Sequence, residues 1–430
     1  MSKDAIFTSG YFNLDRALEL LAKLDYNVVT VYDPKMLDES VNSFCTSKHE
    51  EWTLVFAEEL KKEGFLLEGV NIVRDKVTSA SGYILPLFSL GGRGFAHNNY
   101  FSSIVDHAFL TSISKSNAAY RFIKESNEEY KYKAALLHAD AGNAWNSVIV
   151  ACKEVGIPTF ACFNGAITEC ITAHSAVKYY LNADVYYMHG QYSIDWVEER
   201  YTSDKELVVV GQPSFDVYYP INTEVVPNTF LYNSKTVFSR YGAAFEKVDC
   251  LLDRTNSAFL SHKLSSTMDK EFLQAFAVYQ EEINPEAKLI VSLRPYHTAS
   301  NVDYMNYVSG FGIKDCQVYG YSSTPLKKLL PTVEYVVTGA STVAIESVIN
   351  RKGIVFLPGI SSSYPPYKHM DEWAICSEDM SIESIVESLD LVTFLKDGLV
   401  EACDKYAPYY NYMDDGKASE RLVKDMVGRL

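Results

Sequence analysis

A chain of 430 residues is about two to three times the length of a usual domain, which predicts two domains with separate cores. Hydrophobic residues make up 47% and charged residues 22%, a composition typical of folded chains that argues against long disordered tracts. The formal net charge of -16 argues against a large nucleic-acid surface, although backbone amides at a helix start and one or two basic side chains can still hold a small anion.

The start of the chain and its cysteines indicate a protein of the reducing cytoplasm. The opening MSKDAIFTSGYFNLDRALELL combines a strand-like run with an amphipathic stretch and lacks the apolar core of a signal peptide. The longest apolar runs are far shorter than the roughly 20 residues of a membrane helix. The eight cysteines form no CxxC pair and have no histidines at zinc-ligand spacing, which favours buried thiols over a catalytic cysteine or a metal site. We therefore expect no transmembrane segment and no bound metal.

Short apolar strands alternate with helices in the first half of the chain. Apolar, β-branched runs predict the strands, and apolar residues at helical spacing predict the helices. Strands are predicted at 5–8, 27–32, 134–137, 158–163, 185–188 and 207–210, and helices at 14–23, 50–63, 144–154 and 193–201. The stretch 79–99 is irregular and holds the Gly-rich loop GGRGFAHNN. Strand, helix and strand at this spacing indicate parallel crossovers and a sheet covered by helices.

The alternation weakens after Gln212, where three prolines occur within PSFDVYYPINTEVVPNTF. It resumes with predicted strands at 248–252, 288–293, 317–319, 334–337 and 353–357, and helices at 268–282, 325–330 and 342–350. We therefore predict an N-terminal Rossmann-like domain over 1–215, a linker over 216–246 and a C-terminal Rossmann-like domain over 247–403. A C-terminal helical segment, 404–430, can cross back to the first domain.

The ends of the predicted strands bear the residues that a ligand would meet. Ligands of open parallel sheets bind beyond the carboxyl ends of the strands, where loops and helix starts converge. In the first domain these ends read Ser9-Gly10, His138-Ala139-Asp140 and Asn164-Gly165. Gly, Ser, Asp and His recur at such positions in both halves, so we expect them to line a cleft between the two domains.

The segment EYVVTGASTVAIESVINRKGIVFLPG makes the most specific of these predictions. Its strand runs into Gly339, and Ser341 and Thr342 then open a helix, so hydroxyl groups and free backbone N–H groups lie together at the positive helix end. This arrangement predicts a phosphate site. Glu346, one turn into the helix, is placed to accept hydrogen bonds from the ribose of a nucleotide. The alternative is an N-cap at Ser341 and a solvated charge at Glu346.

The segment KLIVSLRPYHTAS brings two basic side chains to the end of another buried strand. Pro295 ends the strand, between Arg294 and His297. Both side chains can bind a phosphate or diphosphate leaving group and stabilise the charge that develops on it. A structural histidine is the alternative for His297.

Four segments between Ala134 and Gly359 resemble motifs of one group of enzymes, in the same order. ASTVAIESVINRKGIVFLPG resembles the donor motif of GT-B glycosyltransferases. LRPYH resembles the Arg-Pro-His-Pro segment of CDP-glycerol glycerophosphotransferases, bacterial sialyltransferases and capsule Kdo transferases. VVVGQPSFD is similar to a segment of those enzymes and of UDP-N-acetylglucosamine 2-epimerases, and GIPTFACFNG to the Gly-Ile-Pro segment of some of them. The resemblance implies an α/β protein of the GT-B fold, in which two facing Rossmann-like domains enclose an interdomain cleft.

The resemblance also implies where a nucleotide-activated donor would bind. It places the donor phosphates at residues of both segments of the second domain: Arg294, His297, Ser341 and Thr342. Glu346 would bind the ribose. His297 is assigned by position, since Tyr296 and Thr298 alter the Arg-Pro-His-Pro pattern. Helix ends and basic side chains replace a cation here, so no metal or other cofactor is expected.

A carboxylate of the first domain would deprotonate the acceptor hydroxyl. Asp140 is the first candidate for this catalytic base and Glu169 the second, although Asp140 can instead cap the helix that follows it. The residues assigned to the acceptor or to phosphate are Ser9, Gly10, Arg93, Asn164 and Gly165. For Arg93 the alternative is a solvent-exposed turn, and Asn164 stands where the glycerophosphotransferases have a histidine.

The activity expected from the resemblance is a metal-independent glycosyl transfer. It would move a sugar or alditol phosphate from a CMP- or CDP-linked donor to a hydroxyl of a cell-surface glycan or glycolipid. A bacterial cell-envelope or capsule pathway fits these relatives, with the protein in the cytoplasm or held at the inner face of the plasma membrane by a partner or a surface patch. A nucleotide-sugar epimerase or hydrolase, and a non-catalytic relative that binds nucleotide sugars, remain as alternatives.

Overall fold

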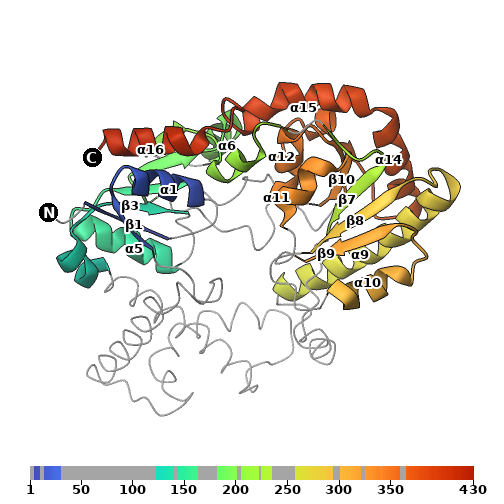
Figure 1. Ribbon diagram of the computed structural model, residues 1–430, viewed down its shortest axis with the longest axis horizontal. Helices are drawn as coiled ribbons and strands as arrows, with labels where there is room; N and C mark the ends of the chain where they lie inside the picture. The colour runs from blue at the N-terminus through green and yellow to red at the C-terminus, as the bar shows by residue number, and fades with distance from the viewer. Residues whose placement is uncertain are drawn as a thin grey trace, which may run out of the picture. The chain divides into compact units, whose positions relative to one another are not determined.

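The structure is a computed structural model of the chain (Figure 1). It describes residues 4–9, 14–30, 123–138, 143–162, 182–200, 205–221, 224–234, 257–293, 301–320, 325–339, 341–358 and 365–430. The chain divides into two compact units. The first comprises Met1–Cys162, Tyr179–Tyr186 and Met426–Leu430, and the second Phe163–Lys178 and Tyr187–Asp425. The described strands form two six-stranded parallel sheets flanked by helices.

The first sheet has the strand order β2-β1-β3-β4-β5-β6. Its strands are β1 (Ala5–Thr8), β2 (Asn27–Thr30), β3 (Tyr132–Leu137), β4 (Thr159–Cys162), β5 (Val185–Met188) and β6 (Glu206–Val209). Every residue of β1, β4 and β5 is buried, as expected of parallel strands covered on both faces. Its helices, in the positions of crossovers between strands, are α1 (Asp15–Lys23), α5 (Asn143–Glu154) and α6 (Gln191–Arg200).

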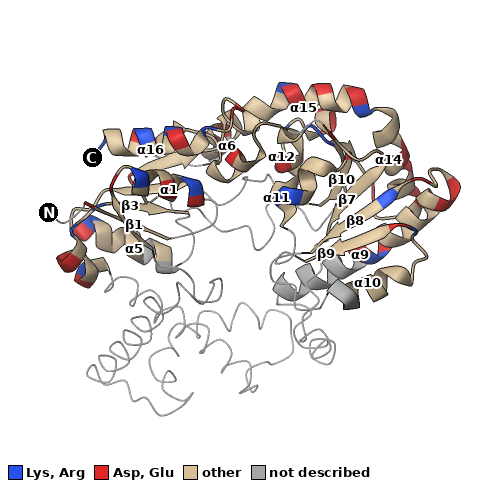
Figure 2. Cartoon of the chain, viewed as in Figure 1, with Lys and Arg blue, Asp and Glu red and all other residues tan. Residues whose placement is uncertain are grey.

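The second sheet has the order β12-β11-β10-β7-β8-β9. Its strands are β7 (Thr229–Asn233), β8 (Lys288–Ser292), β9 (Cys316–Tyr319), β10 (Tyr335–Thr338), β11 (Gly353–Phe356) and β12 (Ile375–Cys376). Its helices are α9 (Ser257–Glu282), α10 (Asn301–Ser309), α11 (Leu326–Leu329), α12 (Thr342–Ile349), α13 (Met370–Trp373) and α14 (Ile382–Phe394). At the centre of its core, Phe230 stacks on Tyr335 with the ring centroids 4.6 Å apart. Figure 2 shows the charged residues mostly on the helices, which leaves apolar side chains to pack the two sheets.

The predicted elements agree with the structure at most of the described positions. The strands at 5–8 and 185–188 have the predicted bounds, and the other predicted strands and helices differ at their ends. Strand β7 was not predicted: its buried residues TFLYN lie inside 216–246, the expected linker, directly after a stretch broken by prolines. Strand β12 and helices α10, α13 and α14 were also missed. The predicted helix 50–63, the strand 248–252 and the Gly-rich loop lie outside the described residues.

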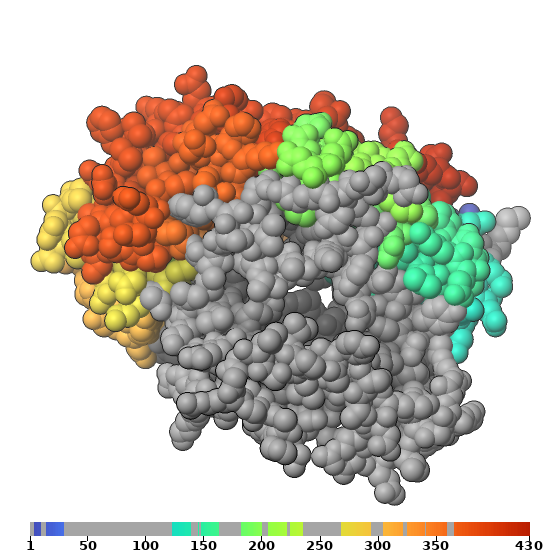
Figure 3. Space-filling view, turned by 180° about the vertical axis from the view of Figure 1, so that it is seen from behind, coloured from blue at the N-terminus to red at the C-terminus, as the bar shows by residue number. Residues whose placement is uncertain are grey.

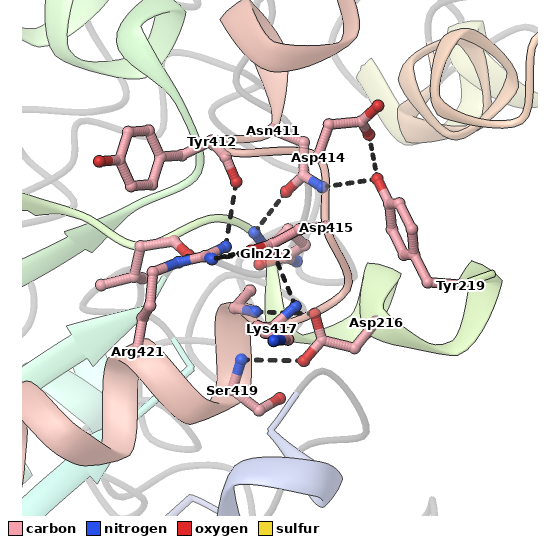
Figure 4. Close-up of polar contacts among 12 residues, drawn as sticks. Gln212, Asp216, Tyr219, Asn411, Tyr412, Asp414, Asp415, Lys417, Ser419 and Arg421 are labelled. Atoms are coloured by element: carbon pink, nitrogen blue, oxygen red, sulfur yellow. Dashed lines mark hydrogen bonds and ion pairs between the residues drawn. The ribbon is translucent and has the colours of Figure 1, made fainter. Parts of the chain in front are cut away.

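The C-terminal helices, α15 (Lys396–Tyr410) and α16 (Ala418–Gly428), are held to the segment that follows β6. Asp216 lies there in the 3-10 helix η3 (Pro213–Tyr218) and is only 2% exposed. Its two carboxylate oxygens accept the backbone N–H groups of Ala418 and Ser419, each at 2.9 Å (Figure 4). N–H groups in the first turn of a helix have no acceptor within it. Asp216 therefore caps α16 from a distant part of the sequence.

Further polar contacts join the same two segments. Arg421 donates to the carbonyl oxygen of Val210 at 2.8 Å, and Asn411 Oδ1 accepts the backbone N–H of Gln212 at 2.8 Å. Gly211 has a φ of +91°, and a Cβ there would lie 2.9 Å from the Cβ of Ala418, so conformation and packing both require glycine. Figure 3 shows the green residues of 187–221 against the orange and red residues of the C-terminal part.

Replacing Asp216 with Ala should lower the free energy of unfolding by about 2–4 kcal/mol, because two buried N–H groups lose a charged acceptor. Asp216→Asn keeps one acceptor oxygen and should lose less. Urea unfolding followed by circular dichroism measures both changes. Asp390→Ala, which removes an exposed carboxylate on α14, is the control and should stay within about 0.5 kcal/mol of wild type. Equal unfolding midpoints for Asp216→Ala and Asp390→Ala would show that the cap adds no stability.

Candidate functional site

In each sheet, the strands that follow one member of a central pair in sequence lie on one side of the pair, and those that follow the other member lie on the opposite side. In the second sheet this pair is β7 and β10: β8 and β9 follow β7 to one side, and β11 and β12 follow β10 to the other. In the first sheet the pair is β1 and β3. Connecting loops diverge at such a switch point, and ligands of open α/β sheets bind there, beyond the carboxyl ends of the strands. The side chains at both switch points are therefore candidates for function.

Helix α12 begins at the switch point of the second sheet. Ser341 is its N-cap: the residue is extended, and its Oγ accepts the N–H of Val343 at 3.4 Å. From the end of β7, Asn233 donates to the same Oγ, also at 3.4 Å. The hydroxyl of Tyr367 donates to the Ser341 carbonyl at 2.9 Å and fixes the cap from another side. A positive helix end with a hydroxyl group is thereby placed between two strand ends, which suits a phosphate.

The carboxylate of Glu346 lies one turn further along α12 and is held at both oxygens. Oε1 accepts the hydroxyl of Thr342 at 3.3 Å, and Oε2 accepts the hydroxyl of Tyr218 from η3. Burial raises the pKa of Glu346 above its ordinary value, and the two hydrogen bonds offset only part of that rise. Burial and the adjacent carboxylate raise the pKa of Tyr218 well above its ordinary value, so the phenol is the donor. The carboxylate is thus oriented, and its residue remains partly exposed.

A second, buried carboxylate supports the end of β7. Asp269 on α9 is 1% exposed and accepts the hydroxyls of Tyr232 at 2.5 Å, Ser234 at 2.6 Å and Tyr304 at 2.8 Å. Three donors satisfy a charge that burial would otherwise make costly. Side chains alternate along a strand, so Asn233 points away from the face that Tyr232 and Ser234 share. The Asp269 cluster therefore directs Asn233 toward Ser341.

Ser9 and His138 meet at the switch point of the first sheet, where they follow β1 and β3. Ser9 is 3% exposed, and its Oγ lies 2.7 Å from His138 Nδ1 and accepts the His138 backbone N–H at 2.9 Å. Trp145 on α5 contacts the imidazole edge-on, with 5.1 Å between the ring centroids. Burial lowers the pKa of His138 to about 4, so the ring is neutral near pH 7. A neutral imidazole can accept a proton during a reaction.

Three of the predicted site residues lie together at the start of α12: Ser341, Thr342 and Glu346. Ser341 caps the helix, and Glu346 is hydrogen-bonded, unlike the solvated charge of the alternative. Ser9 lies in the first sheet, next to His138. The remaining predicted residues fall outside the described part of the chain: Gly10, Arg93, Asp140, Asn164, Gly165, Glu169, Arg294 and His297.

Four side chains that hold the start of α12 were not among the predicted site residues: Tyr218, Asn233, Asp269 and Tyr367. Asn233 directly follows a strand, which is the signal used at other positions, but that strand was not predicted. The partners of Tyr218 and Tyr367 lie 128 and 26 residues away in the sequence. Local sequence patterns hold no signal for contacts of this kind.

No metal-binding arrangement is found within the described ranges, where no three His, Cys, Asp or Glu side chains are placed to share an ion. Burial raises the pKa of the Cys152 and Cys162 thiols to about 12, which makes them poor nucleophiles. Among the same residues, no helix combines the length and apolar character needed to cross a bilayer.

No family model and no curated protein sequence matches the chain, but solved structures resemble it. UDP-N-acetylglucosamine 2-epimerase from Neisseria meningitidis, bound to UDP-N-acetylglucosamine, matches with a TM-score of 0.54 and 11% identity, over 100% of both chains. The same enzyme from Methanocaldococcus jannaschii, in complex with UDP-N-acetylglucosamine and UDP, matches with a TM-score of 0.52 and 12% identity, over 100% of both. A glycosyltransferase from Rickettsia africae ESF-5 matches with a TM-score of 0.50 and 12% identity, again over 100% of both. Likeness at this identity shows the fold, which is the GT-B fold that the sequence resemblance implied.

The neutral state of His138 predicts a specific loss of stability in acid. Its pKa is lower in the folded protein than the ordinary 6.5, so the unfolded chain binds the proton more tightly and stability is lost as pH falls from about 6.5 toward 4. Between pH 7.5 and pH 5 this amounts to about 2 kcal/mol of unfolding free energy. In His138→Asn the unfolding free energy should fall by about 2 kcal/mol less than in the wild type between these two pH values. Urea unfolding at pH 7.5 and pH 5 measures the difference. His369→Asn, which replaces an exposed histidine, is the control and should lose as much unfolding free energy in acid as the wild type. Equal losses in the two variants would show that His138 is not the source of the acid sensitivity.

Proposed function

We propose that the protein binds a nucleotide-activated sugar or alditol phosphate at the start of α12 and transfers the activated group to a hydroxyl of a cell-surface glycan or glycolipid. The observation behind this proposal is the Ser341-capped helix start at the switch point of the second sheet, with Glu346 one turn further on. The donor phosphates would lie at Ser341 and Thr342, at the positive helix end, and the ribose hydroxyls would reach Glu346.

Solved structures with the same fold support nucleotide sugars as the ligand class. The two epimerase structures contain UDP-N-acetylglucosamine, and both match along the whole chain. The preference for a CMP- or CDP-linked donor follows from the sequence resemblance to glycerophosphotransferases and sialyltransferases. On the same ground we assign Arg294 and His297 to the donor phosphates, and we place the protein in a bacterial envelope pathway at the cytoplasmic side of the membrane.

The transfer requires a base that takes the proton of the acceptor hydroxyl while the bond between donor and nucleotide breaks. Asp140 is our first candidate and Glu169 the second; His138, neutral at pH 7, is a further group that can take a proton. The leaving phosphate gains negative charge, which the helix end and basic side chains would stabilise in place of a metal ion. We assign the acceptor or phosphate side to Ser9, Gly10, Arg93, Asn164 and Gly165.

Epimerisation or hydrolysis of a nucleotide sugar is the second candidate, favoured by the likeness to two epimerase structures. Incubation with a panel of CMP-, CDP- and UDP-linked donors, with and without glycan acceptors, separates the candidates. Release of the nucleotide only with an acceptor supports transfer, and an altered or hydrolysed donor without acceptor supports the second candidate. A donor that binds but stays intact under every condition indicates a non-catalytic binding protein. Failure of every donor to bind would refute the proposal.

Ser341→Ala should weaken nucleotide binding about tenfold, because it removes a hydroxyl at the phosphate position and the cap that orders the helix start. Isothermal titration with CMP, CDP and UDP measures the effect. Ser381 is the matched control, since it caps α14 in the same way by accepting the N–H of Ser384 at 3.2 Å. Ser381→Ala should cost about 1 kcal/mol of stability and leave nucleotide affinity unchanged. Equal affinities in the two variants would exclude Ser341 from the binding site.

A further inference from the structure

Two adjacent tyrosines of the segment after β6 are connected to helix α12, one directly and one through Asp414 and Arg351. Tyr218 donates its hydroxyl to Glu346, in the second turn of the helix. Tyr219 donates to Asp414, which also accepts the guanidinium of Arg351, two residues beyond the last residue of α12. Figure 4 shows the contact between Tyr219 and Asp414. The segment that contains Asp216 thus contacts α12 directly at Glu346 and is linked through Asp414 to Arg351, which lies outside the helix.

The hydroxyl of Tyr218 approaches Glu346 from a fixed position. The Tyr218 side chain is buried, with 4% exposure, and its ring packs beside that of Phe215 with the centroids 6.3 Å apart. Two residues earlier, Asp216 is bound to the first turn of α16. A side chain anchored in this way loses little further freedom when it orients a neighbour. Tyr218 therefore differs from a surface residue that happens to touch a carboxylate.

The two hydrogen bonds of Glu346 leave a defined pair of acceptor positions. An ionised carboxylate has about four such positions, two on each oxygen. Among the described residues, Tyr218 occupies one position on Oε2 and Thr342 one on Oε1. Within the described part of the chain, one position on each oxygen has no hydrogen-bond donor. Two adjacent acceptors match the neighbouring 2′- and 3′-hydroxyl groups of ribose, whereas 2′-deoxyribose offers only one of these donors.

We propose that Tyr218 is a positioning residue for nucleotide recognition, which fixes the Glu346 carboxylate so that it receives both hydroxyl groups of a ribose. The inference rests on the proposed function, because the nucleotide must bind at α12. Burial raises the pKa of Glu346, and this hydrogen bond offsets that effect in part, so the carboxylate stays ionised to a lower pH than it would without Tyr218. Helix α15 packs along α12 and carries charged groups of its own. One of them, Asp404, forms an ion pair with Arg351 at 2.8 Å, beyond the C-terminal end of α12.

The test compares the dissociation constant of 2′-deoxy-UDP with that of UDP, and of 2′-deoxy-CDP with that of CDP, by calorimetry between pH 5 and pH 8. Their ratio cancels the titration of the phosphates, which both ligands share. In the wild type the ratio should be about tenfold at pH 8 and fall toward one as Glu346 gains a proton. In Tyr218→Phe the fall should lie at a higher pH than in the wild type, because loss of the hydroxyl raises the pKa of Glu346 further.

Tyr219→Phe is the matched control, since it removes one hydroxyl from the next residue, whose partner is Asp414. Its ratio should follow the wild-type curve, and that of Glu346→Gln should stay near one at every pH. Circular dichroism checks that each variant is folded. A Tyr218→Phe curve that coincides with the wild type, or a wild-type ratio near one throughout, overturns the inference and leaves the proposed function standing. If the wild type binds neither nucleotide, the proposed function and the inference both fail.

Discussion

The burial of helix α12 is the constraint on which the second sheet and its candidate site depend. Six of its eight residues are buried, so its polar groups must find partners inside the protein. An unpaired buried donor or acceptor costs about 1–3 kcal/mol. Ser347, for example, donates to the Val343 carbonyl at 2.6 Å. At the start of the helix, Ser341 and Thr342 are only partly buried, so a ligand can reach them.

The remaining partners of α12 come from segments that are distant in sequence. The residues Tyr218 and Tyr219 belong to the stretch that Asp216 joins to α16, and Asp414 links Tyr219 to Arg351. The proposed recognition of a ribose would therefore depend on the same stretch as stability does, because Asp216, which caps α16, and Tyr218, which donates to Glu346, lie in the same 3-10 helix. Asp216 belongs to the segment VVVGQPSFD, which resembles an enzyme motif. In the structure this carboxylate has a role in the fold, because it binds the first turn of α16.

The two switch points present different chemistry. At the second sheet, a positive helix end and an oriented carboxylate suit a ligand with both phosphate and hydroxyl groups. At the first sheet, Ser9 and a neutral His138 present a hydroxyl group and an imidazole that can exchange a proton without a fixed charge. This difference fits the proposed division between a site that binds the nucleotide and a site that handles the acceptor hydroxyl.

The sequence by itself determined the class of fold, because buried parallel strands and amphipathic helices leave local patterns of hydrophobicity. It also determined the placement of Ser341, Thr342 and Glu346 on one face of a helix start, since these residues lie within a single stretch of chain. Only the tertiary structure decided the environment of that stretch. Strand β7 and the contacts of Tyr218, Asp216 and Asp269 join residues tens to hundreds of positions apart, as with Asp216 and Ala418, which are 202 positions apart. Such partners are chosen by the packing of the whole chain, and no local pattern encodes that choice.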